Sequence, residues 1–160
     1  KTLMILTLLL IFTGLMAEVP SENIKVFQTA GLSGGLLYTI NYGIGIMSPK
    51  RHFEHSCIAH TGFGPFPLIT IKGAYGQSCY FTKNNRLGNF FKLKYGIDHV
   101  LCEFLDSNTI SIEPFMGSGY GYSWKCSKNT QVRAYLDVVY YITSDWKNFP
   151  FISADISFVF

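Results

Sequence analysis

The chain has 160 residues, enough for one domain and too few for two large ones. Only 14% of the residues are charged, whereas 48% are hydrophobic and 16% aromatic, and this balance excludes an intrinsically disordered chain. The formal net charge of +3 is small and scattered, which excludes a nucleic-acid-binding surface. Few charges, many aromatic residues and 15 glycines indicate an all-β protein in an unusual solvent.

The first segment, residues 1–17, has the character of a secretory signal peptide. Lys1 precedes an apolar stretch, and the small Ala17 stands before the first acidic residue, Glu18. The alternative is a short amphipathic or membrane-anchoring helix, although the stretch is shorter than the roughly 20 residues that a spanning helix needs. We therefore predict export from the cytoplasm, with residues 18–160 as the folded domain.

After this segment, apolar residues alternate with polar or small ones, which is the period of a strand with one apolar face. Turn-forming residues separate eight such segments. In chain order the expected strands are 24–29, 35–46, 53–64, 68–81, 89–97, 110–124, 131–142 and 152–160. The first strand is the weakest, and it could join the second through a glycine kink. No helix of consequence is expected after the signal segment.

The polar faces of these segments carry Gly, Ser, Thr and Asn with a few charges of both signs. A water-exposed exterior needs more charge than this, whereas a narrow barrel interior suits it. We therefore expect a single antiparallel, up-and-down transmembrane β-barrel of eight strands, with both termini at one end. The residues expected to line the lumen and to pair there are Thr39, Asn41, Lys72, Lys92, Lys94, Glu113, Arg133, Asp137 and Asp155.

The apolar faces end in aromatic residues, as in Tyr120-x-Tyr122-x-Trp124, and such residues form the interfacial girdles of transmembrane barrels. Strands of about 9–11 residues cross a bilayer when tilted, and closure pairs every backbone group. The residues expected to face lipid are Leu36, Tyr38, Ile40, Leu93, Ile97, Ile112, Leu136, Val138, Ala154, Ile156 and Phe158. The alternative is a soluble, lipocalin-like ligand-binding barrel with these side chains inside.

Several stretches, taken in order, resemble a largely uncharacterised family of small outer-membrane β-barrel proteins common in Bacteroidetes. The run 30–42 is similar to the family's glycine-rich first strand, and 61–71 looks like its second and third strands. The stretches 84–91, 117–122 and 150–160 resemble its later turns and strands. The resemblance covers most of residues 18–160 and implies a fold and a location, but no catalytic residue.

The C-terminal Phe160, with apolar residues at alternate positions before it, resembles the strand signal that the outer-membrane assembly machinery reads. The resemblance therefore implies a place in the bacterial outer membrane, with membrane lipid and that machinery as partners. The chain departs from the family in its four cysteines and in Gly43 and Gly45, which stand where charged residues are usual.

The cysteines Cys57, Cys79, Cys102 and Cys126 allow two disulfides in an oxidising compartment. Small apolar filler inside strands is the more ordinary role for such cysteines. Their spacings of 22, 23 and 24 residues do not match a metal site. No metal or other cofactor is expected.

One polar cluster is compatible with a lipid-modifying hydrolase. It consists of His52, Glu54, His55, Ser56 and His60, with His99 beside Asp98 farther along the chain. On strict alternation Glu54, Ser56 and His60 share a face, but the His-x-Ser spacing of barrel deacylases is missing. Ordinary lumenal or exposed histidines explain the cluster better, so no catalytic residue is predicted.

Three functions remain open from the sequence. The favoured one is a structural or interaction role in the outer membrane, without turnover and with a narrow lumen that side chains fill. A small-solute channel or transporter is the second, although eight strands leave an interior just wide enough for side chains. A lipid-modifying enzyme, or the soluble ligand-binding barrel, is the third.

Overall fold

The structure is a computed structural model that describes residues 24–35, 37–47, 52–64, 69–83, 86–104, 107–142 and 150–160. Its side chains are described for all of these except 102–104 and 107–109. The predicted signal segment and its cleavage point lie outside the described residues, as does Leu36. Among the described residues, no helix is long and apolar enough to cross a membrane.

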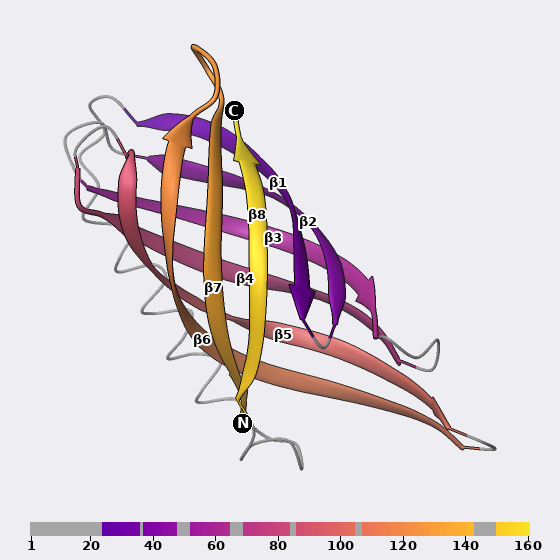
Figure 1. The fold of residues 1–160 in the computed structure, drawn as a ribbon. Helices are drawn as coiled ribbons and strands as arrows, with labels where there is room; N and C mark the ends of the chain where they lie inside the picture. The colour runs from indigo at the N-terminus through magenta and orange to yellow at the C-terminus, as the bar shows by residue number, and fades with distance from the viewer. Residues whose placement is uncertain are drawn as a thin grey trace.

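Eight strands form one closed antiparallel barrel (Figure 1). They are β1 (Lys25–Gly35), β2 (Tyr38–Met47), β3 (Phe53–Phe63), β4 (Ile69–Phe81), β5 (Gly88–Phe104), β6 (Ser107–Lys125), β7 (Gln131–Tyr141) and β8 (Phe151–Val159). Each strand pairs with its neighbours in the chain, and β8 pairs with β1. The expected all-β fold, an up-and-down barrel of eight strands, is confirmed.

The two ends of the barrel differ. The terminal end, as we call it, holds the start of β1, the C-terminus and the connections 48–52, 82–87 and 126–130. There Phe160 exchanges two backbone hydrogen bonds with Gln28, which places both ends of the described chain side by side. The opposite end, called the loop end, holds the other four connections. β5 and β6 project past the other strands at the loop end (Figure 1).

The register of the strands makes the barrel narrow. The ladder that starts at Lys25 passes once round all eight strands and returns to β1 at Gly35, ten residues farther along. Such a stagger tilts the strands against the barrel axis, and with eight strands it leaves an interior that side chains fill. The lumen is therefore a packed core rather than an open pore.

Two expectations about strand limits are wrong. The first strand was expected at 24–29 and the second from residue 35, whereas β1 extends to Gly35 and β2 begins at Tyr38, and the two remain separate strands. The expected ends at 97 and 110 fall inside the long β5–β6 hairpin, because Ser107 and Asn108 pair with Phe104 and Glu103 instead of forming a turn. Pairing along this hairpin outweighs the turn preference of Ser and Asn.

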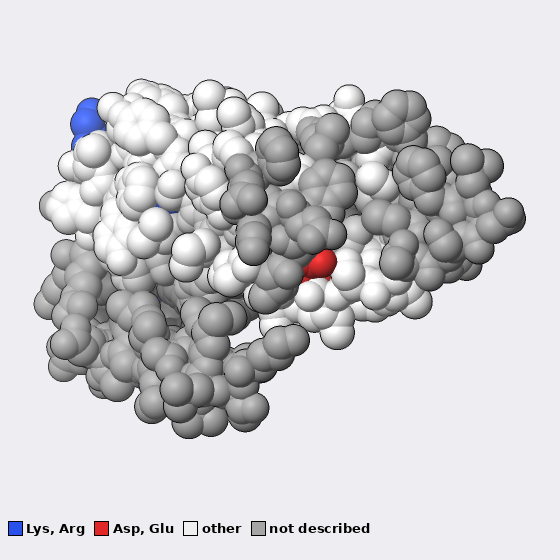
Figure 2. Space-filling model, turned by 90° about the horizontal axis from the view of Figure 1, so that it is seen from below, with Lys and Arg blue, Asp and Glu red and all other residues white. Residues whose placement is uncertain are grey.

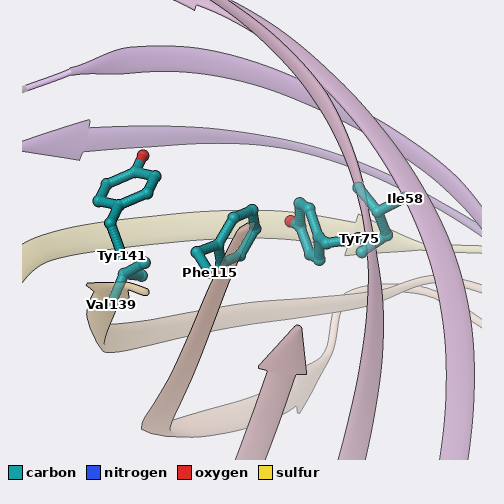
Figure 3. Close-up of a cluster of buried hydrophobic side chains, with 5 residues drawn as sticks. All are labelled: Ile58, Tyr75, Phe115, Val139 and Tyr141. Carbon is teal, nitrogen blue, oxygen red and sulfur yellow. The ribbon is translucent and has the colours of Figure 1, made fainter. Parts of the chain in front are cut away.

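Apolar side chains fill the lumen in three separate clusters: a small one of Phe27, Met47 and Val159 on β1, β2 and β8, and two larger ones. The cluster nearer the terminal end consists of Cys79, Phe81, Phe90 and Tyr135. The cluster nearer the loop end consists of Ile58, Tyr75, Phe115, Val139 and Tyr141, and its three rings lie in a row across the lumen (Figure 3). The charged residues of the lumen lie around and between these clusters.

Candidate functional site: the barrel lumen

An ion-paired layer closes the terminal end of the lumen. Arg133 on β7 binds the Glu54 carboxylate on β3 through two hydrogen bonds, the longer of which measures 2.9 Å from Nη2 to Oε2. Nη1 of Arg86, in the β4–β5 connection, lies 3.8 Å from Oε2 of the same carboxylate. The guanidinium of Arg133 also lies 5.0 Å from the centre of the Phe81 ring. Glu54 and Arg133 are both buried, so solvent hardly reaches this pair.

The second layer occupies the middle of the lumen and centres on Asp137. Nζ of Lys92 lies 2.6 Å, and Nζ of Lys94 2.7 Å, from Oδ2 of Asp137. Lys92 also lies 3.5 Å from the centre of the Tyr135 ring, a cation–π contact. Lys92 and Asp137 are both 0% exposed. Removal of Asp137 would leave the ammonium groups of Lys92 and Lys94 without their carboxylate, which is costly in a buried layer.

A glycine makes room for this ion pair. Gly119 lies opposite Asp137 in the β6–β7 ladder. A Cβ atom at Gly119 would collide with Oδ1 of Asp137 and would come within 2.7 Å of the Leu136 carbonyl oxygen. Glycine here therefore serves the close approach of a charged side chain to the barrel wall, rather than a special backbone angle.

The third layer lies toward the loop end, around Asp98. Oδ1 of Asp98 lies 2.9 Å from Nε2 of His60, and Oδ2 accepts a hydrogen bond of 2.8 Å from the Tyr141 hydroxyl. His60 and Asp98 are almost completely buried. Unlike the first two layers, this layer contains no Lys or Arg that pairs with its carboxylate, Asp98, among the described residues.

A cavity of about 80 Å³ adjoins this third layer. One wall is polar and comes from β1, β2 and β8, with Ser33, Thr39, Asn41 and Ser153. Asn41 donates to Ser33 (2.7 Å) and accepts from Thr39 (3.1 Å), so these side chains hold one another in place. The other wall carries the aromatic rings of the loop-end cluster. The cavity reaches the second layer at Lys94, whereas Arg133, Lys92 and Asp137 do not line it.

Most of the residues expected to line the lumen do lie on its inner face. Asn41, Lys92, Glu113, Arg133, Asp137 and Asp155 are buried there, and Thr39 and Lys94 are partly exposed where they line the cavity. Lys72 is the exception. It is exposed on the outer face near the loop end, between Thr61 and His99 in the ladder. The lumenal face of β4 is instead formed by every second residue from Ile71 to Phe81, and Lys72 does not belong to this series.

The outer face carries the apolar residues expected there. Tyr38, Ile40, Leu93, Ile97, Ile112, Leu136, Ala154, Ile156 and Phe158 are exposed, and Val138 is partly exposed. The most exposed of them are Ile112 at 67%, Ile40 at 63% and Leu136 at 61%. Aromatic residues gather near the two ends of this face: Tyr80, Tyr122, Trp124 and Phe160 at the terminal end, and Tyr38, Phe63 and Tyr140 at the loop end. Aliphatic side chains such as Ile40, Leu93 and Leu136 lie between these ends, together with Tyr42 and Tyr120.

The structure separates the residues of the candidate hydrolase cluster. Glu54 is bound to Arg133, whereas His60 is bound to Asp98 in another layer. His55 lies on the outer face, where its Nδ1 is 2.9 Å from Oγ of Ser78, and both side chains are buried. A Ser, a His and an acid in hydrogen-bonded sequence, as acyl hydrolysis needs, are not brought together among the described side chains.

The cysteines whose side chains are described are all free. Cys57 is exposed on the outer face, Cys126 is exposed in the β6–β7 connection, and Cys79 is buried in the lumen. The disulfides that the sequence allowed therefore do not form among these three cysteines. The side chain of Cys102 lies outside the described part. Within the described residues, no three His, Cys, Asp or Glu side chains gather as ligands of a metal ion.

Comparison with known proteins yields structural neighbours only. No family model matches the chain, and no curated protein matches it in sequence. The solved structure of Neisserial surface protein A (NspA) is similar with a TM-score of 0.57 and 10% identity, covering 85% of this chain and 92% of that one. The N-terminal β-barrel domain of Pseudomonas aeruginosa OprF is similar with a TM-score of 0.64 and 15% identity, covering 86% and 98%. The chain has the fold of small eight-stranded outer-membrane barrels.

Sequence reasoning missed two residues that organise the lumen. Glu54 and Asp98 were considered only as hydrolase candidates, yet each anchors an interior layer. Strict alternation carries the signal for both: Glu54 shares a face with Ser56 and His60, and Asp98 continues the face of Lys92 and Lys94. The partners of these carboxylates lie 79 and 43 residues away in the chain, and no local pattern indicates them.

Proposed function

We propose that the chain is an integral protein of the bacterial outer membrane with a closed lumen, and that it serves a structural or interaction role without turnover. The observation that carries the proposal is that the barrel is charged inside and apolar outside, the reverse of a soluble protein. Buried ion pairs fill the inside, with Lys92 and Asp137 at 0% exposure, whereas aliphatic side chains such as Ile112, Ile40 and Leu136, more than 60% exposed, lie on the outside.

The outer surface fits lipid better than water. A soluble monomer rarely exposes an apolar patch larger than roughly 300–600 Å², and exposed apolar residues occur here on the outer face of every strand. Figure 2 shows one side of the molecule, on which the charged side chains of the described residues are confined to a few small patches. The aromatic residues near both ends of the outer face correspond to the girdles that mark the two membrane interfaces of such barrels.

The inner surface argues against a passive channel. The Glu54–Arg133 layer, the Lys92–Asp137 layer and the aromatic cluster of Phe81 and Phe90 succeed one another along the axis. An ion that crossed the barrel would have to break the buried ion pairs of the two charged layers and pass the packed rings of Phe81 and Phe90. A small-solute channel is thus the less favoured role, and the soluble ligand-binding barrel is disfavoured because its polar and apolar faces would be exchanged.

A planar-bilayer recording of the purified chain tests the closed lumen. We expect no conductance above that of the protein-free bilayer. A variant with Phe90→Ala and Tyr135→Ala, which thins the plug, should raise the conductance, whereas Phe91→Ala on the outer face should not. Stable conductance steps from the unaltered chain would contradict the closed lumen and favour the channel.

The finer assignments belong to the same proposal. Residues 1–17 would direct export, Phe160 would be recognised by the outer-membrane assembly machinery, and membrane lipid would be the immediate partner of the outer face. The order of its motifs supports a relationship with the small Bacteroidetes barrels. Fractionation of cells that express the full chain, with protein found in the outer membrane only when residues 1–17 are present, would test export and location together.

A further inference from the structure

We propose that the cavity at the loop end binds a small protonated amine, whose ammonium group is held by Asp98 and His60 and whose alkyl part lies against aromatic rings. This inference goes beyond the structural role proposed above and does not depend on it. It concerns a binding site within the barrel mouth, and it would hold for a closed barrel as well as for a conducting one.

The first argument is the unsatisfied charge of Asp98. Its carboxylate is bound by two groups, the His60 ring and the Tyr141 hydroxyl. Each can serve as a neutral donor, so neither need supply the full positive charge that a buried carboxylate favours. Glu54 and Asp137, whose carboxylates also lie in the lumen, each pair with Lys or Arg. Asp98 therefore lies at the cavity with room for a cation.

The second argument is an independent one, the free ring nitrogen of His60. The side chain is 6% exposed and lines the cavity, yet its Nδ1 has no hydrogen-bond partner among the described residues. Because Nε2 faces the Asp98 carboxylate, Nε2 carries the proton in the neutral ring and Nδ1 is an acceptor. A buried acceptor without a partner calls for a donor from a ligand or from water.

The aromatic wall supplies the third argument. The rings of Tyr75, Phe115 and Tyr141 follow one another at centroid distances of 6.1 and 6.0 Å (Figure 3). Aromatic rings attract ammonium groups through their negative faces and accommodate alkyl groups by burial. One ammonium already lies beside this wall, because Nζ of Lys94 is 5.6 Å from the centre of the Tyr75 ring while it pairs with Asp137.

The volume limits the ligand to a small one. A cavity of about 80 Å³ holds several water molecules or a ligand of a few non-hydrogen atoms. Methylammonium and ethylammonium are of this size and carry three N–H donors, which match the acceptors that Asp98 and His60 present. An anion of the same size would meet the Asp98 carboxylate and the His60 lone pair, and the one ammonium on the lining, that of Lys94, is already paired with Asp137.

The test is a titration of the folded chain in detergent micelles with methylammonium chloride, followed by NMR of the His60 and Phe115 side chains. We expect a saturable shift at both residues in the millimolar range. Methanol and acetate at the same concentrations should produce none. Asp98→Asn keeps the hydrogen-bond acceptor for Tyr141 and removes the charge, so it should weaken methylammonium binding at least about tenfold.

A matched pair of ring substitutions separates the site from general effects on folding. Phe115→Leu should weaken binding about two- to fivefold, whereas Phe81→Leu in the terminal-end cluster should leave it unchanged. The different gel mobility of unheated and heated samples verifies that each variant is folded. Equal shifts with methanol would show a cavity that takes any polar solute, a preference for acetate would show that Lys94 dominates, and no saturable shift would show water alone. Each of these three outcomes overturns the proposal.

Discussion

The inner and outer faces of strand β7 carry opposite kinds of side chain. On the inner face Arg133 and Asp137 are buried and ion-paired, whereas Leu136, between them on the outer face, is 61% exposed. A soluble protein would show the reverse, because burial of an apolar side chain and hydration of a charge both favour folding in water. The contrast teaches that the outer face suits an apolar surrounding, which is what the proposed membrane location supplies.

The largest expected effect comes from the inner face. Asp137→Asn leaves Lys92 and Lys94 without their carboxylate in a buried layer. We expect it to lower the free energy of unfolding by about 3–5 kcal/mol, as removal of one partner of a buried ion pair does. Urea unfolding in lipid vesicles measures the change. Asp98→Asn is the matched control, and it should cost much less because the amide oxygen can accept from Tyr141 while the amide NH2 donates to Nε2 of His60, whose ring proton then moves to Nδ1. Equal costs would show that the Asp137 charge is not needed.

The next effect comes from the outer face. Leu136→Arg places a charge in the aliphatic middle of the barrel wall, and we expect it to cost about 2–4 kcal/mol of folding into lipid vesicles. Ile110 is equally exposed, but it lies on the part of β6 that pairs with β5 alone and projects past β7. Ile110→Arg should therefore cost about 0–1 kcal/mol. A cost at Ile110 as large as that at Leu136 would contradict a membrane limited to the barrel body.

A smaller effect is expected at Gly119, the glycine of β6 that lies opposite Asp137 in the ladder. Gly119→Ala forces the Asp137 carboxylate out of its position, and we expect a loss of about 1–3 kcal/mol in the free energy of unfolding. Gly34→Ala is the control, since the nearest atom to a Cβ there is 3.8 Å away, and it should stay within about 0.5 kcal/mol. In an Asp137→Asn background the cost of Gly119→Ala should change, because the two residues touch. Strict additivity would argue against the contact.

The smallest perturbation is chemical labelling of the native cysteines in a Cys102→Ser background. In folded protein within vesicles, Cys126 should react with a water-soluble maleimide, because it is exposed in a connection at the terminal end. Cys57, exposed in the middle of β3, should react only with a lipid-soluble maleimide, and Cys79 with neither until the barrel unfolds. Mass spectrometry of the labelled peptides measures this. Rapid labelling of Cys57 by the water-soluble reagent would place it in water.

Much of the fold follows from period-two alternation. The segment 131–142 shows which residues of β7 face in and out without any knowledge of its neighbours. The limits of β5 and β6 do not follow in this way, because Ser107 and Asn108 prefer turns locally and are held in the ladder by partners across the hairpin. Local preference is a weak guide where strand pairing supplies the competing hydrogen bonds.

The lumen was predictable as a list of inward residues but not as a set of contacts. Alternation indicates that Lys92, Arg133 and Asp137 face inward, yet only the stagger of the closed barrel decides that Arg133 meets Glu54 while Lys92 meets Asp137. Lys72 was misplaced because its charge was taken as a sign of the lumen, although it lies on the face opposite Ile71 and Tyr75. The free Nδ1 of His60 depends on three-dimensional contacts alone.

The central claim, that the outer face meets lipid and the inner face does not, can be tested by tryptophan fluorescence with lipids brominated at mid-chain. In a Trp124→Phe, Trp146→Phe background, a single tryptophan is placed by Leu136→Trp or by Tyr135→Trp, at adjacent positions on opposite faces. The account predicts strong quenching at position 136 and little at position 135. Equal quenching at both positions, or quenching at 135 alone, would contradict it.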